Sequence, residues 1–163
     1  MKRAALIYAF AGFLLTACAA TPPAPEQASV PVSELRPALD SLPAEGLPPQ
    51  TLDAGECGLF LWSKSEEPKY IFFSKALSER ALFAQDETPL EMYQTRASGD
   101  IFGQFNTRME FASNDGRQLS LSMVPGDMMN GGQRLESGII TLTDREGWQT
   151  KLPVLGVWGC QPE

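Results

Sequence analysis

The stretch that decides the fold is FNTRMEFASNDGRQLSLSM, residues 105–123. From Phe105 to Phe111, and again from Leu119 to Met123, apolar or uncharged side chains alternate with more polar ones. A period of two is typical of a β-strand with one face in water. Between the two runs lies Ser-Asn-Asp-Gly, residues 113–116, whose residue types tolerate the left-handed backbone of a turn. The stretch therefore predicts an antiparallel β-hairpin.

Short runs of the same kind continue on both sides of this hairpin. Residues 139–143 and 148–152 predict a second hairpin, across a turn at 144–147. In Leu59–Trp62 and Tyr70–Phe73 the apolar residues are consecutive, so we expect both faces of these strands to be covered. A barrel interior would cover one face, and a loop or the preceding segment would cover the other.

The remaining sequence adds weaker signals. Further strands are predicted at residues 81–85, 90–95 and 154–158, and a single helical turn at 75–80. The total is about eight short strands at the spacing of a meander. We therefore expect an all-β fold, a small antiparallel barrel or sandwich of about eight strands, in a domain that spans residues 57–163.

The first eighteen residues have the form of an export signal. Lys2 and Arg3 precede an uncharged, mostly apolar run, residues 4–15, which is shorter than the roughly 20 residues of a membrane-spanning helix. Leu-Thr-Ala-Cys, residues 15–18, resembles the lipobox of bacterial lipoproteins. The resemblance implies that residues 1–17 are a signal peptide and that Cys18 becomes the first mature residue, modified with diacylglycerol and an N-acyl chain. The alternative is a simple secretory leader with a chance cysteine.

The lipid on Cys18 sets the expected location of the protein. Three acyl chains exceed the two signals that hold a protein stably on a membrane, so the membrane is an expected partner. Ala19 and Ala20 stand where lipoproteins retained at the inner membrane of some bacteria have an aspartate. We therefore expect an attachment to the outer membrane, facing the periplasm, rather than to the inner membrane.

Residues 18–56 predict a lipidated, proline-rich tether. They contain eight of the 13 prolines and no aromatic residue, so they have too little apolar area to offset the entropy of ordering. We expect this tether to be disordered, and to act either as a spacer or as a covalent connection with no further role. It carries six acidic residues and one basic residue, and residues 57–163 carry 14 and 10. Neither part has the basic stripe of a nucleic-acid-binding protein.

Two cysteines remain once Cys18 is assigned to the lipid. Cys57 opens the first predicted strand of the domain, and Cys160 closes the last. Because the periplasm is oxidising, an even pair of cysteines predicts a disulfide. A barrel or sandwich that brings its first and last strands together would place the two side by side. The alternative is a redox-active pair, for which the Cys-x-x-Cys spacing is missing.

The residue types present limit the chemistry. The chain has no histidine, which excludes a His-assisted serine or cysteine nucleophile and a His-x-x-x-His zinc site. No serine-hydrolase signature and no calcium-loop pattern occur either. The sequence thus predicts no catalytic residue, no metal ligand and no cofactor, and it favours a non-enzymatic protein that binds a protein partner in the periplasm.

One connection is a candidate binding loop. Residues 125–132 read PGDMMNGG, and we expect a long glycine-rich loop there that carries Met128 and Met129 beside Gly131 and Gly132. Methionine suits adaptable binding surfaces because its side chain is flexible and polarisable. The alternative is an ordinary loop with one methionine tucked inwards.

The expected architecture of the domain also resembles that of a known group of proteins. In size, strand density and a cysteine near each end of the domain, the chain is similar to small periplasmic lipoproteins whose disulfide-clasped, eight-stranded barrels inhibit lysozyme. The resemblance implies inhibition of a cationic protein such as lysozyme, and the net acidic charge would favour such a partner. The alternative function is that of a structural subunit of an outer-membrane or cell-wall assembly.

Overall fold

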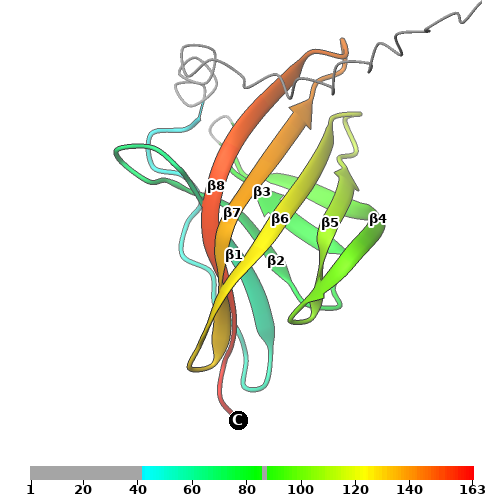
Figure 1. Ribbon diagram of the computed structural model, residues 1–163. Coiled ribbons are helices and arrows are strands. Elements are labelled where there is room, and N and C mark those ends of the chain that lie inside the picture. The colour runs from blue at the N-terminus through cyan, green and yellow to red at the C-terminus, as the bar shows by residue number, and fades with distance from the viewer. Residues whose placement is uncertain (1–41, 86–87) are drawn as a thin grey trace, which may run out of the picture.

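The structure, a computed structural model, describes residues 42–85 and 88–163 (Figure 1). Its strands are β1 (Cys57–Ser63), β2 (Tyr70–Lys75), β3 (Arg80–Phe83), β4 (Leu90–Phe102), β5 (Phe105–Ala112), β6 (Gln118–Met129), β7 (Gly132–Thr143) and β8 (Gln149–Cys160). Each strand pairs with the next one along the chain, and β8 pairs with β1, so the sheet closes into a barrel. The predicted all-β fold is confirmed, and of the two architectures the barrel is the one that forms. The expected signal peptide, Cys18 and residues 18–41 of the expected tether lie outside the described residues.

The hairpin of residues 105–123 forms as predicted. Phe111 lies opposite Leu119, and Met109 lies opposite Leu121, and all four side chains are buried. Because directly opposed residues share a face of the sheet, these pairs fill the barrel interior while the alternate residues face water. The amide of Ser113 donates a 2.9 Å hydrogen bond to the carbonyl of Arg117, and Gly116 takes a positive φ of 92°.

Large side chains from every strand fill the inside of the barrel. The largest with almost no exposed surface are Phe72, Phe83, Phe102, Phe111, Leu59, Leu61, Ile71, Met92, Leu119, Leu121, Ile140 and Leu152. Where β4 and β8 end, the ring of Phe102 packs edge-on against Trp158, with 6.5 Å between ring centroids. An eight-stranded barrel is just wide enough for side chains to fill it, so this interior is a packed core.

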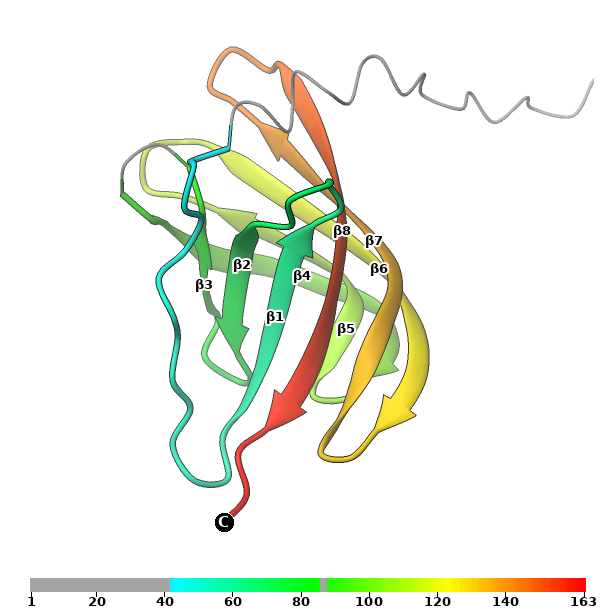
Figure 2. The ribbon, with the colours of Figure 1, turned by 90° about the vertical axis from the view of Figure 1, so that its left-hand side faces the viewer.

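The packed body begins earlier than the sequence indicated. Leu42 and Leu47 are only 7% and 5% exposed and belong to the hydrophobic core, although both fall within the expected tether. The amide of Leu47 donates a 2.6 Å hydrogen bond to the carbonyl of Tyr70 in β2. Figure 2 shows residues 42–56 running along the outside of the barrel into β1. The body therefore starts by Leu42 rather than at Cys57, because leucines spaced among the prolines give this extended segment an apolar face.

Two other local predictions were wrong. Residues 75–80 form a turn and not a helical one, because Leu77 and Glu79 take positive φ values of 61° and 52°. Strand β8 runs without interruption through Pro153, where the sequence indicated two separate strands. Pro153 is paired with Ile139 of β7, and the pairing of β8 with β1 ends next to it, at Val154 and Ser63. The proline therefore lies at the end of the β1 ladder, where a missing amide is tolerated. Its carbonyl accepts a 2.9 Å hydrogen bond from the amide of Lys64.

In residues 42–85 and 88–163, no helix is both long enough and apolar enough to cross a bilayer.

Candidate functional site

The predicted disulfide between Cys57 and Cys160 is confirmed. The two residues are direct partners in the β1–β8 ladder, with 3.9 Å between their Cα atoms and a bond between their sulfurs. The closing pair of strands therefore carries a covalent link at its last register position. Strand β8, which ends at Cys160, runs to the lower end of the barrel in Figure 1, where the chain also ends.

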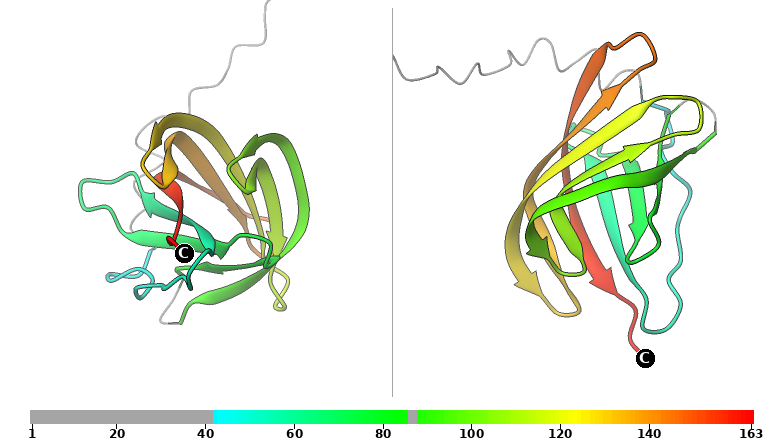
Figure 3. Two further views of the ribbon diagram at one scale, coloured as in Figure 1. Left: turned by 90° about the horizontal axis from the view of Figure 1, so that it is seen from below. Right: turned by 90° about the vertical axis from the view of Figure 1, so that its right-hand side faces the viewer.

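Three hairpin tips are hydrogen-bonded to the two cysteines of this disulfide. The amide of Ala76, after β2, donates to the carbonyl of Cys57 at 2.8 Å, and the amide of Cys160 donates to the carbonyl of Gly131, after β6, at 3.0 Å. The side-chain amide of Gln104, after β4, donates to the sulfur of Cys57 at 3.3 Å. Alternate turns of a meander lie at the same end of a barrel, as the view from below in Figure 3 shows. We call this end, residues 76–79, 100–104 and 127–131 with the disulfide, the disulfide rim.

The rim contains most of the candidate binding loop, in a different form from the predicted one. Strand β6 continues to Met129 and β7 begins at Gly132, so only Asn130 and Gly131 connect them. The prediction of a long glycine-rich loop is therefore wrong. The register of β6 against β7 shifts on either side of Pro125. These irregularities allow the proline and glycine residues, which predicted a loop, to lie within paired strands. The pairing of β5 with β6 stops at Ser122, so Pro125 has no partner residue in β5.

The four residues of that candidate loop have different surroundings. Met128 and Met129 are 69% and 39% exposed at the tip. Gly131 takes a positive φ of 79° in the turn. Gly132 is buried against β8, and a side chain there would collide with the carbonyl of Trp158. The methionines are thus the part of this segment that is available to a partner, and the glycines make the tight turn possible.

An ion pair joins Glu56, the residue before β1, to the end of β2 at this end of the barrel. The ammonium group of Lys75 lies 2.5 Å from the carboxylate of Glu56, which also accepts a 2.8 Å hydrogen bond from the amide of Asp53. The hydrogen bond from Lys75 lowers the pKa of Glu56, and the same bond raises the pKa of Lys75. Both side chains are partly exposed, so solvent weakens their attraction.

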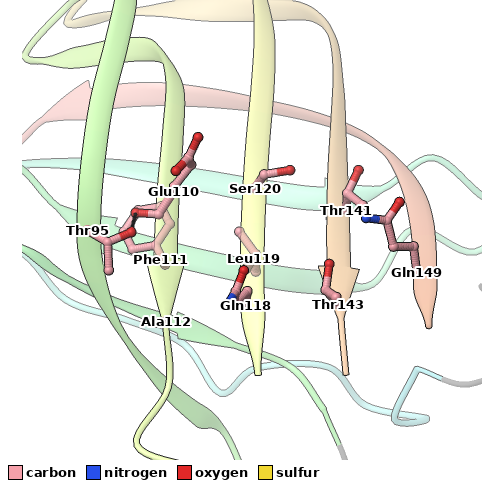
Figure 4. Close-up of a pocket in the computed structure, with 10 residues that line it drawn as sticks. All are labelled: Thr95, Glu110, Phe111, Ala112, Gln118, Leu119, Ser120, Thr141, Thr143 and Gln149. Carbon is pink, nitrogen blue, oxygen red and sulfur yellow. Dashed lines mark hydrogen bonds between the residues drawn. The ribbon is translucent and has the colours of Figure 1, made fainter. Parts of the chain in front are cut away.

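A second feature is a groove on the outer wall of β4–β8 (Figure 4), which we call the wall groove. It has a volume of about 500 Å³ and is lined by Thr95, Glu110, Phe111, Ala112, Gln118, Leu119, Ser120, Thr141, Thr143 and Gln149. The register of β4 against β5 shifts between Gln94 and Arg96, and the hydroxyl of Thr95 donates to the carbonyl of Glu110 at 3.2 Å. The lining offers hydroxyl and amide groups and one carboxylate, which suits water or polar solutes. The alternation of Ser, Thr and Gln along the strands was its only sequence signal.

The comparisons with known proteins give no family for this chain: no protein-family model, no curated protein and no solved structure matches it. Within residues 42–85 and 88–163, no three Cys, Asp or Glu side chains are grouped as a metal site requires.

Proposed function

We propose that this chain is a lipid-anchored envelope lipoprotein that presents its barrel for binding to another protein, without catalysing a reaction. The leader and the Leu-Thr-Ala-Cys motif at residues 15–18 support the anchor on Cys18. The disulfide of Cys57 and Cys160 agrees with an oxidising compartment such as the periplasm. The outer membrane, facing the periplasm, is the proposed location.

The observation that carries the binding role is the exposure of large apolar side chains at the disulfide rim. The barrel interior is occupied by its own side chains, so recognition has to use the outside. Met128 and Met129 are exposed there, on a tip that is tied to the disulfide through Gly131. Clustered apolar side chains in water are unfavourable for a monomer and mark a surface that a partner covers.

The charge of the domain supports a cationic partner. Residues 57–163 hold 14 acidic and 10 basic residues, and opposite charge accelerates association and favours matching partners. Lysozyme is the partner that we propose to test first, since it is cationic and the chain is similar to lysozyme-inhibiting lipoproteins in size, strand density and a cysteine near each end of the domain.

The anchor is tested with Cys18→Ser in the full chain. If Cys18 carries the lipid, this variant should move from the membrane fraction to the soluble fraction of the cell envelope, and the mass of the acyl chains should disappear from its first tryptic peptide. An unchanged distribution would contradict the anchor.

The binding role is tested with the full mature chain, extracted in detergent, added to lysozyme acting on cell walls. We expect inhibition at micromolar protein that weakens as salt rises, because electrostatic attraction is screened over about 10 Å at 0.1 M salt and over less at higher salt. A lysozyme rate that does not change at micromolar protein would remove lysozyme as the partner.

A further inference from the structure

We infer that the disulfide rim is the docking surface of the barrel, and that its partner is a protein that presents an apolar depression bordered by basic side chains. This inference rests on the proposed function, because it names the surface and the chemistry through which a protein would bind.

Each of the three tips at the rim has one large apolar side chain that is more than two-thirds exposed, and Met129 is exposed to a lesser degree beside Met128. Leu77 at the β2–β3 tip is 90% exposed, Ile101 at the β4–β5 tip 73%, and Met128 at the β6–β7 tip 69%. Among the large apolar side chains of the described residues, only Trp148, in the β7–β8 turn at the opposite end, is comparably exposed. The meander topology therefore gathers three separate apolar projections at one end of the barrel.

Each projection has an acidic residue within two positions of it in the sequence. Glu79 follows Leu77, Asp100 precedes Ile101, and Asp127 precedes Met128. In the described part of the chain, none of these three carboxylates takes part in an ion pair, whereas Glu56 at the same end is paired with Lys75. Apolar anchors flanked by unpaired carboxylates complement a surface with an apolar centre and a basic border.

The backbone at Leu77 adds an independent observation. Its φ of 61° lies in the left-handed region, where a residue with a side chain costs about 1–2 kcal/mol. The chain thus holds a leucine in an unfavourable backbone conformation and also holds its side chain in water. Strain of this kind that is kept at an exposed position points to a role for that position in binding.

The tips are also held in place before any partner arrives. Hydrogen bonds from Ala76 to Cys57, from Gln104 to Cys57 and from Cys160 to Gly131 connect each tip to the same disulfide. A surface that is fixed in advance loses less conformational entropy on binding. The three projections can therefore act together as one surface.

The opposite end of the barrel has a single comparable apolar projection, Trp148, where the rim has three, and it also differs in its place along the chain. Its β5–β6 turn carries Asp115, which is paired with both Arg117 and Arg145. The described chain enters there, since the ammonium group of Lys69, in the β1–β2 connection, donates to the carbonyl of Leu42 at 3.5 Å. The rim therefore lies at the opposite end of the barrel from Leu42, the first described residue.

The test is site-specific photocrosslinking of the full chain in intact cells. A photoreactive side chain replaces Leu77, Ile101 or Met128 at the rim, and controls replace Ser120 in the wall groove or Glu66 at the opposite end. We expect the three rim positions to capture one and the same protein, at least tenfold above both controls. Migration of the disulfide-linked chain in a non-reducing gel shows that each variant is folded.

Charge reversal then tests the chemistry of that partner. Asp100→Lys and Asp127→Lys should each reduce the crosslinked product about tenfold, while Glu66→Lys and Glu146→Lys at the opposite end should leave it unchanged. Capture that these reversals do not alter would overturn the inference, and so would rim positions that capture only lipid. Capture of a protein from the control positions but not from the rim would overturn this inference, but it would still support the proposed function of protein binding. Capture of no protein from any position would overturn both.

Discussion

Gly103, at the β4–β5 tip, shows how tightly a single residue of the rim is packed. Its φ is 64°, and a Cβ placed there would overlap the ring of Trp158, which closes the lower end of the core. Gly103→Ala should therefore lower the free energy of unfolding by about 2–5 kcal/mol, as the sum of left-handed strain and overpacking. Urea unfolding measures this loss.

The control for Gly103 is a glycine with the same backbone strain and open surroundings. Gly116, in the β5–β6 turn, has a φ of 92°, and nothing lies within 4 Å of a Cβ added to it. Gly116→Ala should cost only about 1–2 kcal/mol. Equal losses for the two variants would show that the packing against Trp158 does not contribute.

Asp115 predicts a dependence of stability on pH. The hydrogen bond from Arg117 lowers its pKa, and a hydrogen bond from Ser113 adds to the effect. A lowered pKa in the folded state stabilises the fold above the ordinary aspartate pKa of about 4, and this stabilisation is lost as the pH falls towards the lowered value. Asp115→Asn should thus be less stable than the parent at pH 7, and the difference should shrink below about pH 4.

The pH dependence is measured by urea unfolding at several pH values, with Glu146→Gln as the control. The side-chain carboxylate of Glu146, in the β7–β8 turn, takes part in no ion pair or hydrogen bond within the described residues. Glu146→Gln should leave the free energy of unfolding nearly unchanged at every pH. A constant deficit of Asp115→Asn from pH 7 to pH 2 would mean that its ion pairs do not account for its effect.

At the scale of elements, the segment of residues 42–56 behaves as part of the barrel. Leu47 is 5% exposed, and burying a leucine to this degree makes its truncation to alanine cost about 2–5 kcal/mol. Leu47→Ala should show that loss in urea unfolding. Leu77→Ala, at a leucine that is 90% exposed, should stay within about 0.5 kcal/mol of the parent. If Leu47→Ala left the free energy of unfolding unchanged, residues 42–56 would not contribute to the stability of the barrel.

The elements that the sequence predicted best are those in which the alternation of side chains is undisturbed. Residues 105–123 formed the expected hairpin because every second side chain could enter the core and a glycine was present at the left-handed turn position. The positions of Cys57 and Cys160 at the two ends of the domain were enough to predict their disulfide. The hairpin required only neighbouring strands, and the disulfide required only the expectation that the first and last strands of the domain meet.

The elements that were predicted wrongly depend on such contacts. Proline and glycine at residues 125–132 indicate a loop, yet the neighbouring strands β7 and β8 extend the ladder past them through irregular register. The leucines of residues 42–47 are buried only because β2 offers the carbonyl of Tyr70 and a face to cover. The rim was visible in the sequence only through Met128 and Met129, because the topology alone brings Leu77 and Ile101 to the same end.

At the scale of the whole molecule, the disulfide should act mainly on the unfolded chain. Cys57 and Cys160 are 103 residues apart, and closing a loop of about 100 residues stabilises a fold by about 4–5 kcal/mol in the chain-entropy model. The variant with both Cys57→Ser and Cys160→Ser should lose about this amount in urea unfolding. Domains of this size have total stabilities of about 5–15 kcal/mol, so this loss takes away a large part of the total. A loss below about 1 kcal/mol would contradict the entropic account.

The same double variant distinguishes the effect of the disulfide on the whole barrel from its effect on the rim. Seven register pairs join β1 to β8, and six of them do not involve the cysteines, so the closed barrel should persist under native conditions with its β-sheet signal in circular dichroism. The rim should change more, because the tip at Gln104 loses the sulfur that accepts its hydrogen bond, and the tips at Ala76 and Gly131 are bonded to a pair that is no longer linked. Hydrogen exchange at the amides of residues 76 and 160 should therefore accelerate much more than exchange in the middle of β5 and β6. Equal acceleration in both places would mean that the disulfide holds the whole barrel together and has no special effect on the rim.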